Sequence, residues 1–455
     1  MNKLLTQAKK FNVSGPRYTS YPTALQFEVA ENDPALGLYL EERKKRATSL
    51  SLYIHIPFCF SLCWYCGCTK VITKNQDRGD TYIDYLEKEM KLLTGTLHPD
   101  SITEQIHFGG GTPTFLSPPQ LLRLGSLLHR YFNLAGTLEF SVEIDPRRVS
   151  TEHIDAIVEI GCNRVSLGIQ DTNTDVQTAI RRVQSFEESA RITEMARNAG
   201  IESVNFDLIY GLPKQTLSTF KKTLDQVISL DPDRFAIYSY AHMPSIMPSQ
   251  KLLNEADLPS VEEKLSMLVH AVNTLPARGY NFIGMDHFAK EADELSIALN
   301  NGTLQRNFQG YSTRPELEMI GLGMSSISQG WDFYTQNEKD LSRYYQLLDE
   351  GTLPVKKILT LSEEDLLRRR IIMQIMCKGE ILFDEYPLHN GLPFSERFSE
   401  ELASLAPFEK EGLIQLSEKG VKITPDGRLF LRNIAMVFDE YLQKKIHQNA
   451  YSKTI

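Results

Sequence analysis

The sequence predicts an α/β fold: an open (partial) TIM-type βα barrel of about six parallel strands, with an N-terminal arm and a mainly helical C-terminal domain. Three observations support this prediction. In the middle of the chain, short runs rich in β-branched and aromatic residues alternate with longer amphipathic segments. Each short run is apolar along its body and becomes polar or glycine-rich where it ends. After about residue 355 the alternation stops and helical patterns dominate.

The predicted strands and helices follow one another in order. The strands are expected at 51–56, 105–110, 138–145, 164–171, 204–211 and 234–241, with a possible seventh at 280–288. Helical segments lie between them at 80–93, 117–132, 186–200 and 216–230. Ser117, followed by two prolines, is a typical helix start, and Gly200 is a typical helix stop.

Length and composition set the domain organisation. The chain has 455 residues, of which 42% are hydrophobic, so one large domain with a smaller companion is expected. We predict an arm over 1–47, a barrel domain over 48–350, and a helical, winged-helix-like domain over 351–455. The last part is predicted to contain a helix over 362–380 and then a helix, a hairpin and a helix over 398–445. Many acids and no basic recognition face argue against DNA binding there, so we interpret it as a lid near the barrel mouth.

Charge and hydropathy exclude several classes of protein. There is no run of eighteen apolar residues and no apolar signal-peptide core at the N-terminus, which predicts a cytoplasmic protein without a membrane segment. A net charge of −9 and a pI near 5.7 leave no basic footprint for nucleic acid. A small-molecule substrate and a monomer are expected.

The polar ends of the six strands predict one shared site. In βα barrels the active site forms at the C-terminal ends of the strands, because the loops there converge on one mouth. The ends concerned are GGGTPT after residue 108, EID at 143–145, GIQD at 168–171, Asp207, SYAH at 239–242 and MDHF at 285–288. The alternative is that these are ordinary strand ends entering polar turns.

Four of the six cysteines follow the first strand, at positions 59, 63, 66 and 68. A reducing compartment makes disulfides rare, so metal binding or catalysis is the more frequent role for such a cluster. Structural zinc sites usually pair two short cysteine knuckles, whereas Cys162 and Cys377 are isolated here. Three closely spaced thiolates on one loop suit a four-iron cluster with one iron left open. Zinc-binding or buried structural cysteines remain the alternative.

The motif CFSLCWYC matches the CxxxCxxC signature of radical S-adenosylmethionine enzymes. The segments YIHIPFC, CGC, HFGGGTPT, VEIDP, GIQD, FDLIYGLP, YAHMP, GMDHFA and RNFQGY further resemble the oxygen-independent coproporphyrinogen III oxidases. SGPRYTSYPTA resembles the N-terminal arm of that family, so the resemblance runs from about residue 10 to the C-terminus.

The resemblance implies a site for one [4Fe-4S] cluster and a first S-adenosylmethionine. The cluster ligands would be Cys59, Cys63 and Cys66, while Cys68 would not be a ligand and is either a small loop residue or a residue near the radical site. The loop containing Gly110, Gly111 and Thr112 would bind the methionine amino group, with a plain tight turn as the alternative. Tyr53 and Glu143 would position this cofactor, and no general acid or base is assigned. His55 is either part of this site or a core histidine.

The family also binds a second S-adenosylmethionine, and the matching positions are Gln170, Arg182, Asp207 and Ala241, with Gly111 and Thr112 contributing. Tyr65 and Ile327 resemble cofactor-contacting positions too. For Arg182 and Asp207, a structural ion pair is the alternative.

The implied reaction is the oxidative decarboxylation of two propionates of coproporphyrinogen III by a 5′-deoxyadenosyl radical, giving protoporphyrinogen IX in haem biosynthesis. A flavodoxin-type reductant would supply electrons and an unidentified acceptor would remove them. Substrate carboxylates need cationic or hydrogen-bonding anchors, for which the candidates are Arg17, His287, Arg306, Asn307 and Gln309. Several of these residues would alternatively brace the arm.

Three other functions are alternatives to the oxidase. A haem-binding or haem-trafficking relative typically has phenylalanine in place of Cys68 and lacks the extended arm, so both features favour the oxidase. A radical S-adenosylmethionine methyltransferase that acts on haem would keep both cofactor sites and differ in its substrate pocket. A non-enzymatic iron–sulfur or zinc scaffold leaves the GGGTP loop, Glu143, Gln170 and Asp207 unexplained.

Overall fold

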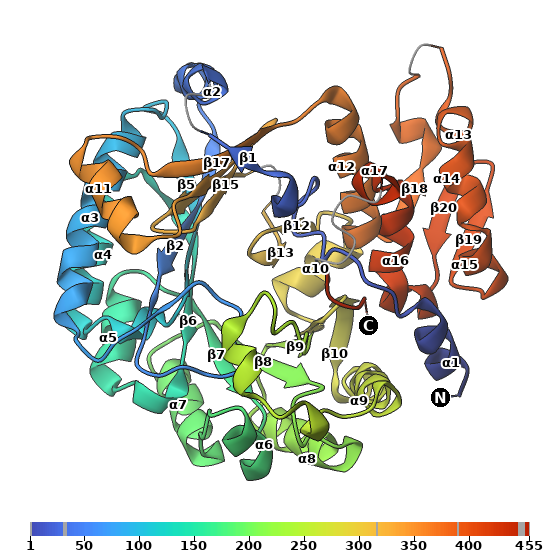
Figure 1. The fold of residues 1–455 in the computed structure, drawn as a ribbon, viewed down its shortest axis with the longest axis horizontal. Helices are drawn as coiled ribbons and strands as arrows, with labels where there is room; N and C mark the ends of the chain where they lie inside the picture. Colours follow the sequence, from blue (N-terminus) through green and yellow to red (C-terminus); the bar gives the residue numbers. More distant parts are fainter. Residues whose placement is uncertain (1, 31–33, 315–316, 389–390, 445–450, 455) are drawn as a thin grey trace.

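Seven parallel strands form the centre of the structure, a computed structural model that describes residues 2–30, 34–314, 317–388, 391–444 and 451–454. Their order across the sheet is β14, β2, β5, β6, β7, β8, β9, and each neighbouring pair is parallel. They curve into an incomplete ring (Figure 1). Their bounds are β2 (Ser49–Ile56), β5 (Ile102–Gly110), β6 (Leu134–Ile144), β7 (Arg164–Gln170), β8 (Ser203–Tyr210), β9 (Arg234–Ser239) and β14 (Glu318–Leu322).

Antiparallel strands extend both edges of this sheet. Beyond β14 lie β15 (Ile327–Gln329), β16 (Phe333–Asn337), β17 (Val355–Thr360) and β1 (Glu28–Val29), and beyond β9 lie β11 (His287–Lys290) and β10 (Tyr280–Gly284). Within the described ranges no pairing joins β1 to β10, so the barrel is open, as predicted.

The six predicted strands are confirmed, but the possible seventh at 280–288 is wrong as a single strand. A turn with positive φ at Gly284 and Met285 splits it into the hairpin of β10 and β11, and β11 runs antiparallel to β9. The seventh parallel strand is β14, which pairs with β2 and was not predicted.

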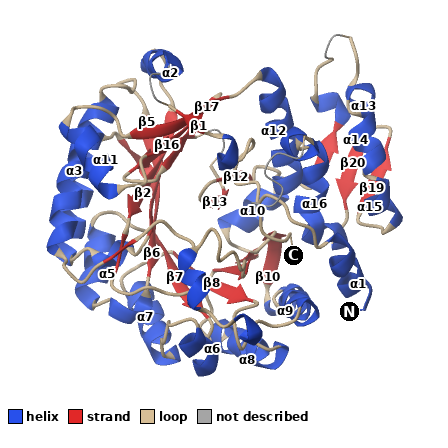
Figure 2. Cartoon of the chain, viewed as in Figure 1, coloured by secondary structure: helices blue, strands red, loops and turns tan. Residues whose placement is uncertain are grey.

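Most helices lie on the outer face of the sheet (Figure 2). Ser117 and Gln120 form a capping box at the start of α4, and Gly200 follows α7 with φ +88°, so the predicted start and stop are confirmed. The helices around the barrel are α3 (Asp77–Thr94), α4 (Pro118–Tyr131), α5 (Thr151–Glu159), α6 (Thr174–Ala179), α7 (Phe186–Asn198), α8 (Leu217–Ile228), α9 (Val261–Thr274), α10 (Glu294–Asn300) and α11 (Leu341–Asp349).

The inner face of the barrel is polar. Tyr53 of β2 pairs with His107 of β5, and His107 pairs with Ser141 of β6. The alternate residues Leu52 and Ile54 are fully buried in the core cluster that the helices share with the sheet. Closed βα barrels fill their interior with branched aliphatic side chains. A polar interior therefore leaves room for a ligand instead of forming a core.

The C-terminal part begins with α12 (Glu363–Cys377), which confirms the helix predicted at 362–380. A small sheet follows in the order β18 (Glu380–Leu382), β20 (Gly420–Ile423), β19 (Ile414–Ser417), and it contains the predicted hairpin. The predicted helices on either side of the hairpin are divided into short pieces, namely α14 (Ser399–Ser404) and α15 (Ala406–Lys410) before it and α16 (Leu431–Ala435) and α17 (Glu440–Gln443) after it; α13 (Phe394–Arg397) precedes them. Residue 445 lies outside the described residues.

The N-terminal arm carries α1 (Asn2–Phe11) and α2 (Pro34–Lys44). Phe11 stacks on Phe408 of α15, with ring centroids 4.6 Å apart. Arg432 of α16 donates to the Pro16 carbonyl at 2.8 Å. The arm thus joins the C-terminal part to the open side of the barrel. None of the helices in the described ranges combines the length and apolar character needed to cross a membrane.

Candidate active site

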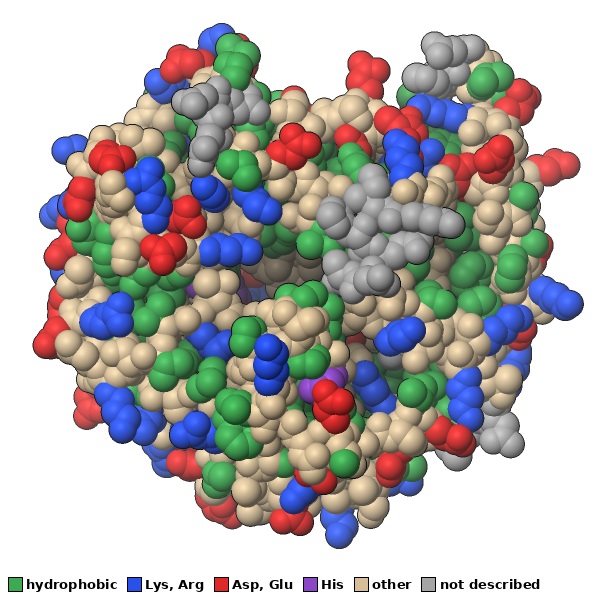
Figure 3. Space-filling model, viewed as in Figure 1, with side chains coloured by type: hydrophobic (Ala, Val, Ile, Leu, Met, Phe, Trp, Pro, Cys, Tyr) green, Lys and Arg blue, Asp and Glu red, His purple; other side chains and the backbone are tan. Residues whose placement is uncertain are grey.

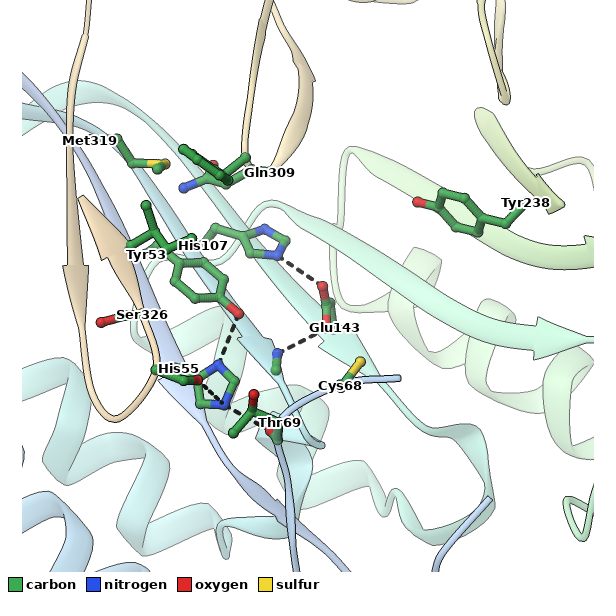
Figure 4. Close-up of a pocket in the computed structure, with 14 residues that line it drawn as sticks. Tyr53, His55, Cys68, Thr69, His107, Glu143, Tyr238, Gln309, Met319 and Ser326 are labelled. Atoms are coloured by element: carbon green, nitrogen blue, oxygen red, sulfur yellow. Dashed lines mark hydrogen bonds and ion pairs between the residues drawn. The ribbon is translucent and has the colours of Figure 1, made fainter. Parts of the chain in front are cut away.

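Three adjoining cavities occupy the mouth and the interior of the barrel, and Glu143 and Tyr238 line all three. The cysteine cavity, of about 250 Å³, contains Cys59, Cys63 and Cys66. The tyrosine cavity, of about 380 Å³, contains Tyr53 and is shown in Figure 4. The basal cavity, of about 140 Å³, is lined by deeper residues of the strands. In Figure 3 the face toward the viewer is hollowed near its centre.

The cysteine loop runs from β3 (Phe58–Cys59) to β4 (Val71–Ile72), two short parallel strands. Backbone bonds from Val71 to Pro57 and from Thr73 to Cys59 fix its base. The N–H of Cys66 donates to the Cys63 carbonyl at 3.2 Å, which draws the middle of the loop into a turn. The three candidate ligand cysteines therefore face one cavity at the barrel mouth, where the sequence predicted them.

Two arginines approach the central cysteine. Arg147 and Arg182 each place a guanidinium nitrogen 3.7 Å from Cys63 Sγ. Both also donate to Asp145, at 2.6 and 3.2 Å. Burial opposes ionisation of Asp145, but the two guanidinium groups outweigh it and hold the pKa of this carboxyl well below its usual range. Positive charge beside Cys63 fits a thiolate or an anionic cluster better than a neutral thiol.

The other cysteines differ in their surroundings. Burial raises the pKa of the Cys59 thiol to about 11, although Thr112 Oγ1 lies 3.4 Å from its sulfur. A hydrogen bond from the Cys68 thiol lowers the pKa of Cys66 to about 6. In the described part of the chain, no three His, Cys, Asp or Glu side chains converge on a single metal-ion position. Thiolates of a four-iron cluster bind different irons, so a cluster does not require the three sulfurs to converge on one position.

The glycine loop at the end of β5 comes close to other backbone and to Glu143. Gly110 has φ +107°, and its N–H donates to Glu143 Oε2 at 3.2 Å. A Cβ atom on Gly109 would lie 2.9 Å from Glu143 Oε1, and one on Gly111 would lie 2.6 Å from the Pro57 carbonyl. Side chains at these positions would fill the space that now separates the cysteine loop from Glu143. The loop lines the cysteine cavity with the backbone of Gly110 and Gly111, whose N–H groups donate to Glu143 and to the Ile56 carbonyl.

Glu143 is the carboxylate shared by the three cavities. His107 Nε2 lies 3.2 Å from Glu143 Oε1 (Figure 4). Burial would raise the pKa of Glu143, but the hydrogen bond and charge of His107, together with the Gly110 N–H, lower it below its ordinary value. The group is therefore an anion that can accept from hydroxyl or ammonium groups of a ligand.

Tyr53 and His55 connect β2 to the cysteine loop. The Tyr53 hydroxyl lies 3.2 Å from His55 Nδ1, and His55 Nε2 lies 3.0 Å from the Thr69 carbonyl (Figure 4). Burial lowers the pKa of His55 to about 4, so the ring is neutral at pH 7. Its Nε2 must then carry the proton that Thr69 accepts, and Nδ1 accepts from Tyr53. His55 thus lines the tyrosine cavity and also braces the loop.

The residues matched to a second cofactor are divided between cavities. Tyr65, Gly111, Thr112, Gln170, Arg182 and Asp207 line the cysteine cavity, and Ile327 lines the tyrosine cavity. The alternative of an ion pair between Arg182 and Asp207 is wrong, because Arg182 pairs with Asp145. Asp207 instead accepts from Ser166 and Asn205, and burial raises its pKa to about 7.

Ala241 is not among the residues that line these cavities. Its carbonyl accepts from Gln250 Nε2 at 3.1 Å, and the same amide donates to the Tyr65 carbonyl at 3.1 Å. It therefore lies one side chain away from the cysteine loop.

The candidate substrate-binding residues lie in different parts of the site. Gln309 lines the tyrosine and basal cavities, and His287 lines the basal cavity. Arg17 pairs with Asp286 at 2.7 Å and lies over the ring of Tyr238, which faces all three cavities.

The remaining two candidates, Arg306 and Asn307, are bonded to other residues of the chain. Arg306 donates to the carbonyls of Arg17 and Tyr18, so it braces the arm, as the alternative predicted. Asn307 Oδ1 accepts from the Gln309 backbone N–H at 2.9 Å.

Sequence reasoning missed several residues of the site. His107 and Tyr238 line the cavities, and Arg147 lies beside Cys63 and pairs with Asp145. The period of two along a strand could have revealed His107, since it lies two residues before Gly109 and faces the same side. Arg147 had no comparable signal, because its role depends on the fold of the loop after β6.

Comparisons with known proteins identify the family of the chain. Residues 53–227 match the radical SAM superfamily model, and residues 361–430 match the HemN C-terminal domain. The oxygen-independent coproporphyrinogen III oxidase of Salmonella typhimurium is 43% identical over 99% of this chain and 98% of its own length. That of Pseudomonas aeruginosa is 44% identical over 98% of this chain and 97% of its own.

A solved structure of the Escherichia coli coproporphyrinogen III oxidase HemN, described as a radical SAM enzyme, superposes with a TM-score of 0.89. The two sequences are 42% identical, and the match covers 93% of this chain and 97% of the other. The chain therefore belongs to the family of oxygen-independent coproporphyrinogen III oxidases, within the radical SAM superfamily.

Proposed function

We propose that this chain catalyses the oxygen-independent conversion of coproporphyrinogen III to protoporphyrinogen IX. Two propionate side chains lose carbon dioxide and become vinyl groups. The observation that carries the proposal is the cysteine cavity, where three cysteines, the glycine loop and Glu143 face one another beside a polar barrel interior. When bound, a [4Fe-4S] cluster and S-adenosylmethionine supply the 5′-deoxyadenosyl radical that takes a hydrogen atom from the propionate.

Cys59, Cys63 and Cys66 would hold the cluster, which leaves one iron for S-adenosylmethionine. Arg147 and Arg182 support this assignment because they offset negative charge beside Cys63. Cys68 is the exposed member of the group and is not assigned as a ligand.

The first S-adenosylmethionine would bind between the glycine loop and Glu143. The backbone of Gly110 and Gly111 approaches the cysteine cavity without side chains, and Glu143 can accept from an ammonium group or from ribose hydroxyls. Tyr53 would position the adenosyl end, since its ring stacks on His107 beside the same carboxylate, with ring centroids 5.8 Å apart.

A second S-adenosylmethionine would contact Gln170, Asp207 and Arg182 from the cysteine cavity, with Thr112, Tyr65, Ile327 and Ala241 around it. Gln170 supports this because it ends β7 with φ +68° beside the cavity. Asp207 supports it because a buried carboxyl with a pKa near 7 gains from a cationic ligand.

Coproporphyrinogen III would occupy the tyrosine and basal cavities. Gln309 and the neutral His287 offer hydrogen bonds there, and Arg17 offers a cation at the rim. Burial of the site within the barrel would exclude water from the radical.

The chain would act as a cytoplasmic monomer, with a flavodoxin-type protein as reductant and a separate acceptor for the electron released as each vinyl group forms.

The deciding experiment is anaerobic incubation of the reconstituted protein with coproporphyrinogen III, S-adenosylmethionine and a reductant. We expect 5′-deoxyadenosine together with a product that has lost carbon dioxide and two hydrogen atoms per reacted side chain. Formation of 5′-deoxyadenosine while the porphyrinogen keeps its mass would refute the oxidase. A gain of a methyl group by haem would instead indicate the methyltransferase.

A further inference from the structure

Two arginine pairs flank the cysteine loop in the same way. Arg147 and Arg148 follow β6, and Arg181 and Arg182 follow α6. In each pair one arginine points inward and lies 3.7 Å from Cys63 Sγ, as described above. The other arginine of each pair is exposed at the surface.

The two exposed arginines cover aromatic side chains of the cysteine loop. Arg148 lies 4.9 Å from the ring centre of Phe60, and Arg181 lies 6.0 Å from that of Trp64. Phe60 follows Cys59 directly in the chain, and Trp64 follows Cys63. Cations and aromatic rings therefore form the outer surface beside two of the three proposed ligands.

We define the cysteine-loop face as residues 59–74, 146–149, 180–183 and 243–253. The last segment belongs to this face because Ser249 donates to the Cys66 carbonyl at 3.1 Å and the side chain of Met247 packs against Gly67. These four segments contain seven Lys or Arg residues, of which Arg147 and Arg182 point inward, and no Asp or Glu, although the whole chain has a net charge of −9. In Figure 3 the surface below and to the left of the hollow carries several Lys and Arg side chains.

Exposed apolar side chains lie among these cations. Ile72 is 43% exposed, Val183 60%, Ile246 50% and Leu252 52%. A basic rim with a few exposed apolar residues is suited to a small, transient complex with an acidic partner.

Resting on the function proposed above, we infer that the cysteine-loop face docks a small acidic one-electron carrier protein that reduces the cluster. One electron passes from the reduced carrier to the [4Fe-4S] cluster, so that the carrier is oxidised and the cluster reduced by one equivalent. Arg148 and Arg181 attract the carrier through charge, and the aromatic residues beneath them lie between the carrier and the ligand cysteines. Arg147 and Arg182, by contrast, face the cluster.

The test compares three double variants of the reconstituted protein. R148E/R181E reverses both exposed charges, and R148K/R181K keeps charge without the planar guanidinium. The matched control, K45E/R130E, reverses two cations whose side chains are 66% and 67% exposed. These lie before β2 and at the end of α4, at the opposite end of the barrel strands.

Two readouts are used with purified flavodoxin as the probe. The first is the dissociation constant of oxidised flavodoxin by calorimetry, which does not depend on turnover. The second is the rate of cluster reduction by reduced flavodoxin at low salt, compared with reduction by a neutral photoreduced deazaflavin.

For R148E/R181E we expect flavodoxin binding and flavodoxin-driven reduction to weaken by about 10-fold or more, with deazaflavin-driven reduction unchanged. R148K/R181K and K45E/R130E should stay within about twofold of the parent chain. If R148E/R181E binds flavodoxin as tightly as K45E/R130E does, the inference is overturned. A parallel fall of both reduction rates at unchanged affinity also overturns it, because the arginines then only support the cluster loop. Normal cluster reduction by flavodoxin without decarboxylation would contradict the proposed substrate but would still support the docking face.

Discussion

The Glu143 carboxylate accepts the Gly110 N–H at 3.2 Å, which ties the end of β6 to the glycine loop at the end of β5. His107 holds the other oxygen of the same carboxylate. Two neighbouring strands thereby fix the position of the one acidic group that all three cavities share.

Glu143→Gln should reduce 5′-deoxyadenosine formation by about 100-fold, because an amide no longer attracts an ammonium group and disturbs both existing hydrogen bonds. The affinity for S-adenosylmethionine should weaken in an equilibrium binding assay. Glu159→Gln is the control, since this exposed glutamate ends α5 and lines none of the three cavities. Equal effects of the two variants would contradict a specific role for Glu143.

Serine at Cys59, Cys63 or Cys66 should prevent assembly of the cluster, measured as iron content and visible absorbance after reconstitution. Cys68→Ser and the buried Cys162→Ser should keep the cluster. Full iron loading of Cys63→Ser would show that the assignment of ligands is wrong.

Asp207→Asn should stabilise the protein without cofactor at alkaline pH. Burial raises the pKa of Asp207 to about 7, whereas an unfolded aspartate titrates near 3.8. The folded state therefore keeps a proton that the unfolded state loses, and stability falls as the pH rises from 3.8 to 7. At pH 8 the variant should gain roughly 1–3 kcal/mol in free energy of unfolding, with little gain at pH 4. A gain independent of pH would contradict this explanation.

His55→Gln should make the free energy of unfolding less dependent on pH in the acidic range. The pKa of His55 in the folded chain, about 4, lies below the ordinary value of 6.5, so protonation of His55 favours the unfolded state. The contribution of the neutral ring to folding stability is therefore complete above pH 6.5 and is lost as the pH falls toward 4. Between pH 7.5 and 5, the parent chain should lose roughly 2 kcal/mol more than the variant in denaturant unfolding. Identical pH profiles would show that folding does not lower the pKa of His55.

The sequence predicted the parts of the fold that depend on local pattern. The six strands have apolar bodies and polar ends, and Ser117 and Gly200 mark helix limits through their own backbone preferences. β14 was missed because it spans only Glu318–Leu322 and pairs with β2, which lies far earlier in the chain. The strand predicted over 280–288 was wrong because the turn at Met285 requires a positive φ that no glycine or asparagine at that position signals.

The candidate site also has residues that the sequence predicts and residues that it does not. Cys59, Cys63, Cys66 and the glycine loop were placed at the mouth because they follow strand ends, and the structure brings them together. The partner of Arg182 was not predictable, since the choice of Asp145 over Asp207 depends on how three separate loops pack.

The open edge of the barrel bears on how a macrocycle could enter and leave. Among the residues that the structure describes, no hydrogen-bonded ladder joins β1 to β10, and the side-chain pair of Arg17 and Asp286 links the arm to the barrel on this side. Entry of a flat substrate from this side would separate side-chain contacts such as this one and break no pairing among the seven parallel strands.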